Sequence, residues 1–218
     1  MPIINAWGVV LSRRNLSEND HLSVIYTENF GKIPVRFVGV KKPGRKMKAL
    51  SEPLAWGEYR LYLSARTQYG KAIGGQLIGT FPEIRADFAK TVAALGCCEL
   101  MSELAPDHSP NAEKYRLLCA ALALLSHQGS PWIPVAFGLQ LLALAGVGLG
   151  EAVVSGLDKS VWRALHEMEL AALADLNYDA PAAARADQAL RAHVEMTTGR
   201  ALKTSEFRRQ MQAAPPLC

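Results

Sequence analysis

The first 80 residues alternate between short apolar runs and clusters of turn-forming residues, a pattern typical of a β-rich domain. The run from Trp56 to Arg66 alternates most clearly, with Tyr59 and Leu61 on one side and Arg60 and Tyr62 on the other. Apolar, β-branched runs predict strands at 5–12, 21–27, 31–40, 56–66 and 69–80, with a polar turn over 13–20. Five short strands with glycine bends predict a small closed barrel, for which the OB-fold is the leading candidate.

From residue 81 the apolar residues follow the spacing of helices instead. Ser109 followed by Pro110 is typical of a helix start, and Gly199 of a helix end. Helices are expected from Phe81 to Leu95, and over 109–129, 132–150, 157–176 and 182–197. The sequence therefore predicts an α+β protein with two domains, a five-stranded OB-fold barrel at 1–80 and an all-helical domain at 81–218.

The uncharged run from Pro131 to Gly150 is long enough to span a bilayer, but prolines and glycines interrupt it. Its continuous helical part, from Val135 to Ala145, is too short to span, so we expect a buried core helix. The N-terminus has no charged start followed by an apolar core, so no signal peptide is expected. These features predict a cytoplasmic protein that does not enter the membrane.

The four cysteines, Cys97, Cys98, Cys119 and Cys218, contain no C-x-x-C pair. They form neither a zinc knuckle nor a convincing disulfide framework, and reduced thiols are the simplest interpretation. Two His/Glu pairs, His166 with Glu169 and His193 with Glu195, leave a metal-dependent hydrolase as one alternative. Their charged neighbours are more typical of solvated helix faces, so we expect no metal, no cofactor and no catalytic residues.

Charge separates the two predicted domains. Residues 1–80 contain 12 Lys and Arg against 5 Asp and Glu, whereas residues 81–218 contain 12 against 15. The segment from Gly31 to Ser51 has no acidic residue, and its end is a basic loop made of Lys41, Lys42, Arg45, Lys46 and Lys48. Such a loop is either simply solvated or a contact for a polyanion, whose counterions it would release.

Tyr62 lies on the outward side of its strand together with Arg60 and Arg66. An aromatic ring beside guanidinium groups can stack on unpaired bases while the cations follow the phosphates. Tyr62 alone would more often be surface packing, but the basic loop in the same domain favours nucleic-acid binding.

At this point the residues resemble a family, the bacterial RecO recombination mediators. The N-terminal part of the match is carried by Val10-Leu11-Ser12-Arg13-Arg14, Glu18-x-Asp20-x-Leu22, Thr27, Gly31-Lys32, Gly39, Leu50 and Pro53. The join Phe81-Pro82 and the closing Gly199-Arg200-x-Leu202-Lys203-Thr204-x-x-Phe207 carry the rest. Many family members have a four-cysteine zinc motif where this chain reads 150–156 without cysteine, so it resembles the zinc-free branch. Its loop also has Met47-Lys48-Ala49 in place of the usual Ser-Arg-Phe.

The resemblance implies a DNA repair protein that is not an enzyme. Such proteins bind single-stranded and duplex DNA, anneal complementary strands and, with RecR, help RecA replace single-strand binding protein, whose C-terminal tail is a further partner. It also implies a place in the bacterial nucleoid. We expect Tyr62 to stack on bases, and phosphates to be contacted by Arg13, Arg14, Lys32, Arg36, Lys41, Lys42, Arg45, Lys46, Lys48 and Arg66. An OB-fold RNA-binding module remains an alternative, because the residues alone do not separate DNA from RNA.

Overall fold

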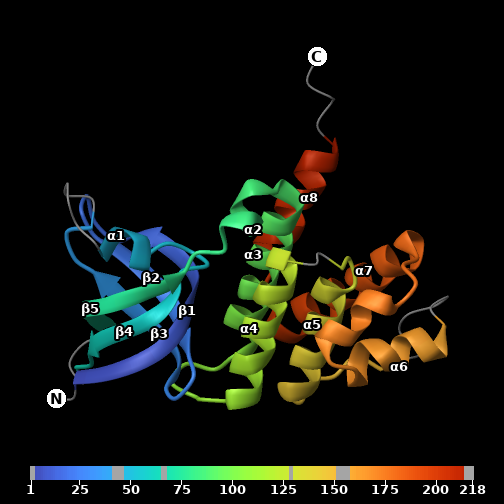
Figure 1. Cartoon of the computed structure of the whole chain (residues 1–218), viewed down its shortest axis with the longest axis horizontal. Coiled ribbons are helices and arrows are strands. Elements are labelled where there is room, and N and C mark those ends of the chain that lie inside the picture. Colours follow the sequence, from blue (N-terminus) through green and yellow to red (C-terminus); the bar gives the residue numbers. More distant parts are fainter. Residues whose placement is uncertain (1–2, 41–46, 65–67, 128–129, 151–157, 214–218) are drawn as a thin grey trace. The chain divides into compact units, whose positions relative to one another are not determined.

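Five strands form the closed barrel that the N-terminal alternation predicts (Figure 1). They are β1 (Ile3–Asn15), β2 (His21–Thr27), β3 (Gly31–Phe37), β4 (Trp56–Tyr62) and β5 (Gly70–Gly79). The strand order is β1-β2-β3-β5-β4, and only the β3–β5 pair is parallel. The computed structural model describes residues 3–40, 47–64, 68–127, 130–150 and 158–213. The barrel and the helices that follow confirm the α+β class.

Strand β1 is longer than its apolar run. Its first half pairs with β4, and its second half pairs with β2 as far as Asn15, opposite His21. Arg13 and Arg14 therefore lie in a strand, opposite Ser23 and Leu22, and the prediction that the turn begins at Arg13 is wrong. The backbone ladder with β2 holds these polar residues extended, because ladder hydrogen bonds do not depend on apolar side chains.

The barrel interior contains the side chains that the alternation assigns to it. Phe37 and Tyr59 are fully buried and meet edge to face, with ring centroids 6.4 Å apart. The Tyr59 hydroxyl donates to the carbonyl of Ala55, and burial raises the pKa of this phenol. Leu50, from the short helix α1 (Met47–Leu50), packs into the same core. Tyr59 and Leu61, which the alternation places on one side of their strand, are thus both buried in the core.

A helical segment belongs with the barrel. The chain divides into two compact units, and unit 1 joins Met1–Pro82 to Met101–Cys119, which includes the end of α3 (Phe88–Leu104) and the start of α4 (Ala112–His127). Tyr115 of this segment accepts a hydrogen bond from the indole N–H of Trp56 at 3.3 Å. A glycine is required at Gly31, which has a φ of +69° and whose added Cβ would lie 2.4 Å from the carbonyl oxygen of Ser109.

The predicted helix start at Ser109-Pro110 is wrong, because α4 begins at Ala112. The side chain of Asn111 caps this helix by accepting from the backbone N–H of Lys114 at 2.9 Å. The residues just before it are held beside β3 instead, since His108 N–H donates to the carbonyl of Lys32 at 3.0 Å. A local turn signal therefore gave way to a tertiary contact.

Unit 2 comprises Glu83–Leu100 and Ala120–Cys218, and is helical. Its elements are α2 (Pro82–Ala86, of which Pro82 belongs to unit 1), most of α3, the end of α4, α5 (Ile133–Leu144), α6 (Lys159–Glu167), η2 (Leu170–Asp175), α7 (Ala180–Thr198) and α8 (Lys203–Ala213). Helix α5 is buried along most of its length and packs against α6, η2 and α7. In the described part of the chain, no helix is long and apolar enough to cross a membrane.

The single helix predicted over 157–176 is in fact two elements, α6 and η2, separated by extended residues Met168 and Glu169. Gln140 on α5 explains the break, because its side-chain amide donates to the carbonyls of Leu165 and Met168 at 3.0 and 2.9 Å. The break also lets Leu170 and Leu173 be buried, whereas Met168 is exposed.

Candidate functional site

The start of the segment that contains the basic loop is fixed by a buried carboxylate. Asp20, just before β2, accepts from Arg36 Nε and Nη2 through Oδ2, at 3.0 and 2.6 Å. Its Oδ1 accepts the backbone N–H of Gly39 at 2.8 Å. The hydrogen bond from Gly39, followed by that from Arg36, lowers the pKa of Asp20, so the carboxylate is ionised at neutral pH. The end of β3 is thereby held in one position.

The other end of this segment, at Ser51, is attached to β2. Ser51 Oγ lies 3.0 Å from Nδ1 of the buried His21, and the Ser51 carbonyl accepts from Ser23 Oγ at 2.8 Å. Both ends of the stretch from Gly39 to Ser51 are thus attached to β2 or the residue before it. The two ends of the segment that contains the basic loop are therefore fixed to unit 1.

The residues that are expected to contact phosphates differ in their exposure and in their ion pairs. Arg14 and Arg36 are exposed on either side of Leu22, which is their register partner in both ladders. Arg13 is also exposed and pairs with Glu52 at 2.6 Å. Lys48 is exposed on α1. The loop residues Lys41, Lys42, Arg45 and Lys46, with Arg66, lie outside the described residues.

Lys32 is half-buried, unlike the other basic site residues that the structure describes. Its side chain is 16% exposed, and its ammonium contacts the carboxylate of Asp107 at 3.2 Å. It also donates to the carbonyl of Ser102 at 2.6 Å. These contacts attach the 101–119 segment to the barrel, and a phosphate contact by Lys32 stays a prediction.

Tyr62 is half-buried on the outer side of β4, in register with the exposed Ile3 on β1. Arg60 follows on the same side, and an added Cβ at its partner Gly74 would meet only the Arg60 side chain, at 3.9 Å. The sequence did place Tyr62 and Arg60 together on an outward face. It did not identify Trp7, which is 41% exposed on the same side of β1; its even spacing of four residues from Ile3 was the available signal.

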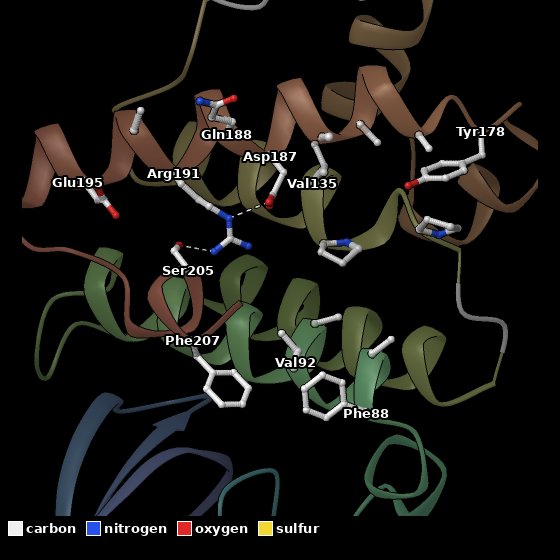
Figure 2. Close-up of a pocket in the computed structure, with 18 residues that line it drawn as sticks. Phe88, Val92, Val135, Tyr178, Asp187, Gln188, Arg191, Glu195, Ser205 and Phe207 are labelled. Atoms are coloured by element: carbon white, nitrogen blue, oxygen red, sulfur yellow. Dashed lines mark hydrogen bonds and ion pairs between the residues drawn. The ribbon is translucent and has the colours of Figure 1, made fainter. Parts of the chain in front are cut away.

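Unit 2 contains a cavity of about 1050 Å³ between α3, α5, α7 and the start of α8 (Figure 2). Its lining is mostly apolar and includes Val92, Val135 and Tyr178. Phe88 and Phe207 form a pair at this cavity, 58% and 45% exposed, with ring centroids 6.1 Å apart. The sequence predicted a helix from Phe81 to Leu95 but not this cavity, because the pairing of Phe88 with Phe207 joins residues far apart in the chain.

Three charged side chains, Asp187, Arg191 and Glu195, are part of this mostly apolar lining. Figure 2 shows Arg191 of α7 reaching toward α8, with its guanidinium bound to Asp187 and Ser205. The Arg191–Asp187 contact is 2.8 Å long, and the arginine side chain is 16% exposed. The start of α8 is held in turn by Glu99, which accepts the backbone N–H groups of Lys203 and Thr204 at 2.7 and 2.9 Å. The cavity thus combines an apolar lining with an arginine that is paired with Asp187.

The histidines considered as metal ligands bind backbone carbonyls instead. His166 Nδ1 donates to Trp162 O at 3.1 Å, and His193 Nε2 donates to Val147 O at 2.8 Å. Among the described residues, no group of three His, Cys, Asp or Glu could hold a metal ion. Cys97, Cys98 and Cys119 are free cysteines, and the first two are buried. The segment 151–157, where a zinc motif would fall, lies outside the described residues.

Two family models match this chain in order. The model described as "Recombination protein O N terminal" matches residues 1–81, and "Recombination protein O C terminal" matches residues 85–152. Together they include the barrel, all of α3 and α4, and α5.

Relatives from several bacteria are similar to the chain. DNA repair protein RecO of Clostridium perfringens is 30% identical over 151 residues, 68% of this chain and 61% of that protein. The Bifidobacterium animalis protein of the same name is 34% identical over 160 residues, 68% of this chain and 64% of its own. The matches thus span less than two thirds of these two relatives. The Desulforamulus reducens protein is 25% identical over 244 residues, 95% of this chain and 94% of its own. The chain belongs to the DNA repair protein RecO family.

Proposed function

We propose that this chain is a DNA repair and recombination mediator that acts by binding single-stranded DNA, without catalysing a reaction. The observation that carries the proposal is the pair Arg14 and Arg36, exposed on neighbouring ladders of the barrel. The basic loop that leaves from the same region adds further cations. Membership of a family of DNA repair proteins supports DNA as the polyanion.

The proposed mechanism is electrostatic. Two complementary strands repel each other through their phosphates, and a surface rich in Arg and Lys reduces this repulsion while it releases counterions. Contacts to phosphates carry little sequence information, so the bound strand keeps its bases available for pairing. The protein would therefore anneal complementary strands and also bind the duplex that forms.

Partners would bind unit 2 and help exchange proteins on the DNA. We propose that the acidic C-terminal tail of single-strand binding protein enters the cavity lined by Phe88, Val92 and Val135, with an anionic group near Arg191. By holding this tail, the chain would bring its barrel to DNA coated by that protein. With RecR, it would then help RecA assemble on the strand.

The decisive experiment measures binding and annealing by the full chain. Fluorescence anisotropy with a labelled oligonucleotide should give a plot of log affinity against log salt with a slope near −0.7 for each phosphate contact. Strand annealing should be accelerated on naked strands and on strands coated with single-strand binding protein. A salt-independent affinity, or no acceleration on either substrate, would refute the proposal.

Two controls separate the alternatives. Competition by RNA and DNA of the same sequence tests the RNA-binding module, since only a contact to the 2′-hydroxyl would favour RNA. Extensive dialysis against a chelator tests the metal-dependent hydrolase. We expect DNA to compete at least as well as RNA, and annealing to be unchanged after dialysis.

A further inference from the structure

One continuous rung of residues runs around the barrel through five strands. Starting from Arg14 on β1, the register partners are Leu22 on β2 and Arg36 on β3. Arg36 is in turn opposite Lys71 on β5, across the parallel pair, and Lys71 is opposite Tyr62 on β4. Partners in adjacent strands lie on the same side of the sheet. The rung therefore places three cations and one aromatic ring in a row on the outside of unit 1.

The burial and contacts of these residues fit a binding surface. Arg14, Arg36 and Lys71 are exposed, and Leu22 lies buried between the two arginines. Arg14 and Lys71 make no ion pair with the residues that the structure describes, whereas Arg36 is oriented by Asp20. Adjacent strands are about 4.8 Å apart, so the four intervals from Arg14 to Tyr62 span roughly 19 Å along the surface. That length is sufficient for a short single strand to contact several residues.

The two ends of the rung differ in a way that suits a nucleotide chain. Its β1–β2–β3–β5 part presents positive charge, and its β4 end presents Tyr62 beside the exposed, apolar Ile3. The acidic residue on this side of β4 is Glu58, four residues away along the strand and opposite Trp7. Phosphates are thus favoured along the cationic part and an unpaired base at the aromatic end.

We propose that single-stranded nucleic acid crosses the strands along this rung, with Lys71 as the phosphate contact that joins Arg36 to a base stacked on Tyr62. This inference rests on the proposed function and specifies the path within it. Charge complementarity selects the occupant, because a row of cations beside one aromatic residue suits a polyanion with flat bases better than an apolar peptide. Duplex DNA is disfavoured at the Tyr62 end, since its bases are already stacked.

The test is anisotropy of the full chain with a labelled oligonucleotide over a salt series. Lys71→Glu should weaken binding by roughly three- to tenfold at moderate salt and reduce the salt slope by about 0.7, the value for one phosphate contact. Lys71→Arg should retain affinity. The matched control is Arg116→Glu, which makes a similar charge change at an exposed position of the same unit, on α4, and should have a smaller effect.

Stacking of a base on Tyr62 is tested separately, by the affinity of Tyr62 variants for single strands. Tyr62→Ala should lower single-strand affinity by about tenfold with an unchanged salt slope, and Tyr62→Phe should retain it. Binding to blunt duplex should be affected by Lys71→Glu more than by Tyr62→Ala. Thermal unfolding of each variant should match that of the parent chain, and Tyr62→Phe is the matched reference for Tyr62→Ala.

The outcomes separate two questions: whether the chain binds DNA, and whether the strand follows this rung. If Lys71→Glu behaves like Arg116→Glu while Arg14→Glu weakens binding, the strand does not follow the rung, although the proposed function stands. Equal losses for Tyr62→Phe and Tyr62→Ala would also overturn the path, because they would assign the effect to the hydroxyl. Absence of DNA binding by the parent chain would remove the proposed function and the path together.

Discussion

The carboxylate of Asp20 binds the side chain of Arg36 with one oxygen and the backbone N–H of Gly39 with the other. It therefore connects the residue before β2 to the end of β3, at the point where the chain enters the stretch that contains the basic loop. Asp20 is buried, whereas the Arg36 side chain is 49% exposed. The pair thus orients a cation at the surface by means of an anion below it.

Replacing this carboxylate should make the free energy of unfolding less dependent on pH in the acid range. The pKa of Asp20 is lowered in the folded state, so its contribution is present above the ordinary value of 3.8 and is lost as the pH falls through the lower folded value. Asp20→Asn should reduce the free energy of unfolding by about 1.5–3 kcal/mol from about pH 5 upward, the range for charge-assisted hydrogen bonds. Below about pH 4 the difference from the parent chain should shrink.

Denaturant unfolding at a series of pH values measures this effect. Asp175→Asn, at an exposed position on η2, is the control and should leave stability nearly unchanged at every pH. A difference between the parent chain and Asp20→Asn that grows toward low pH would contradict the assignment.

Two glycines with nearly the same backbone conformation should differ in their tolerance of alanine. Gly31 has a φ of +69° and Gly199 a φ of +68°. An added Cβ at Gly199 would meet nothing within 4 Å, whereas at Gly31 it would lie 2.4 Å from the Ser109 carbonyl oxygen. Gly199→Ala should cost about 1 kcal/mol, from backbone strain alone. Gly31→Ala should cost about 3 kcal/mol or more, because the 101–119 segment must also move.

Thermal and denaturant unfolding of the two variants provides the comparison. Gly31→Ala should in addition make the 101–119 segment more accessible to a protease. Equal costs for the two substitutions would mean that the segment is not held against the β2–β3 turn.

Charge reversal in the basic loop should weaken DNA binding without unfolding the chain. Lys41→Glu combined with Lys42→Glu should reduce the magnitude of the salt slope by about 1.4, the value for two phosphate contacts. The control is Arg116→Glu combined with Arg163→Glu, an equal change of charge at exposed helical positions. If the loop variant and the control have the same affinity and slope, the loop is a solvated turn.

The sequence predicted the barrel well because strand periodicity has a local cause. Tyr59 and Leu61 point inward and Arg60 points outward simply because successive side chains of a strand alternate. The sequence was less informative wherever a distant residue decides the outcome. Gln140 ends α6 through two carbonyls, and His108 is held by Lys32, so neither boundary follows from the residues next to it.

The candidate site was only partly predictable for the same reason. A run of lysines is visible in the sequence, but the use of Lys32 inside unit 1 depends on Ser102 and Asp107, about 70 residues later in the chain. Likewise, the rung that joins Arg36 to Lys71 depends on the parallel pairing of β3 and β5. That residues 1–80 bind DNA and residues 81–218 bind protein partners stays a prediction. The contacts of 101–119 with the barrel argue against testing it with a truncated chain.

The cavity of unit 2 offers a test of partner binding in the intact chain. Phe88 and Phe207 are both largely exposed, so truncating them should cost little stability while removing the aromatic pair at the cavity. We expect Phe88→Ala combined with Phe207→Ala to weaken binding of a synthetic acidic tail peptide by at least tenfold, because large aromatic side chains dominate such contacts. Affinity for naked single strands should be unchanged, since DNA is proposed to bind unit 1.

Met196→Ala, at a position of α7 that is 77% exposed and does not line the cavity, is the matched control. Calorimetric titration of each full-length variant with the peptide, and anisotropy with DNA, gives the two readouts. Unchanged peptide binding in the double variant would place the tail elsewhere, and a parallel loss of DNA affinity would contradict the separation of the two sites.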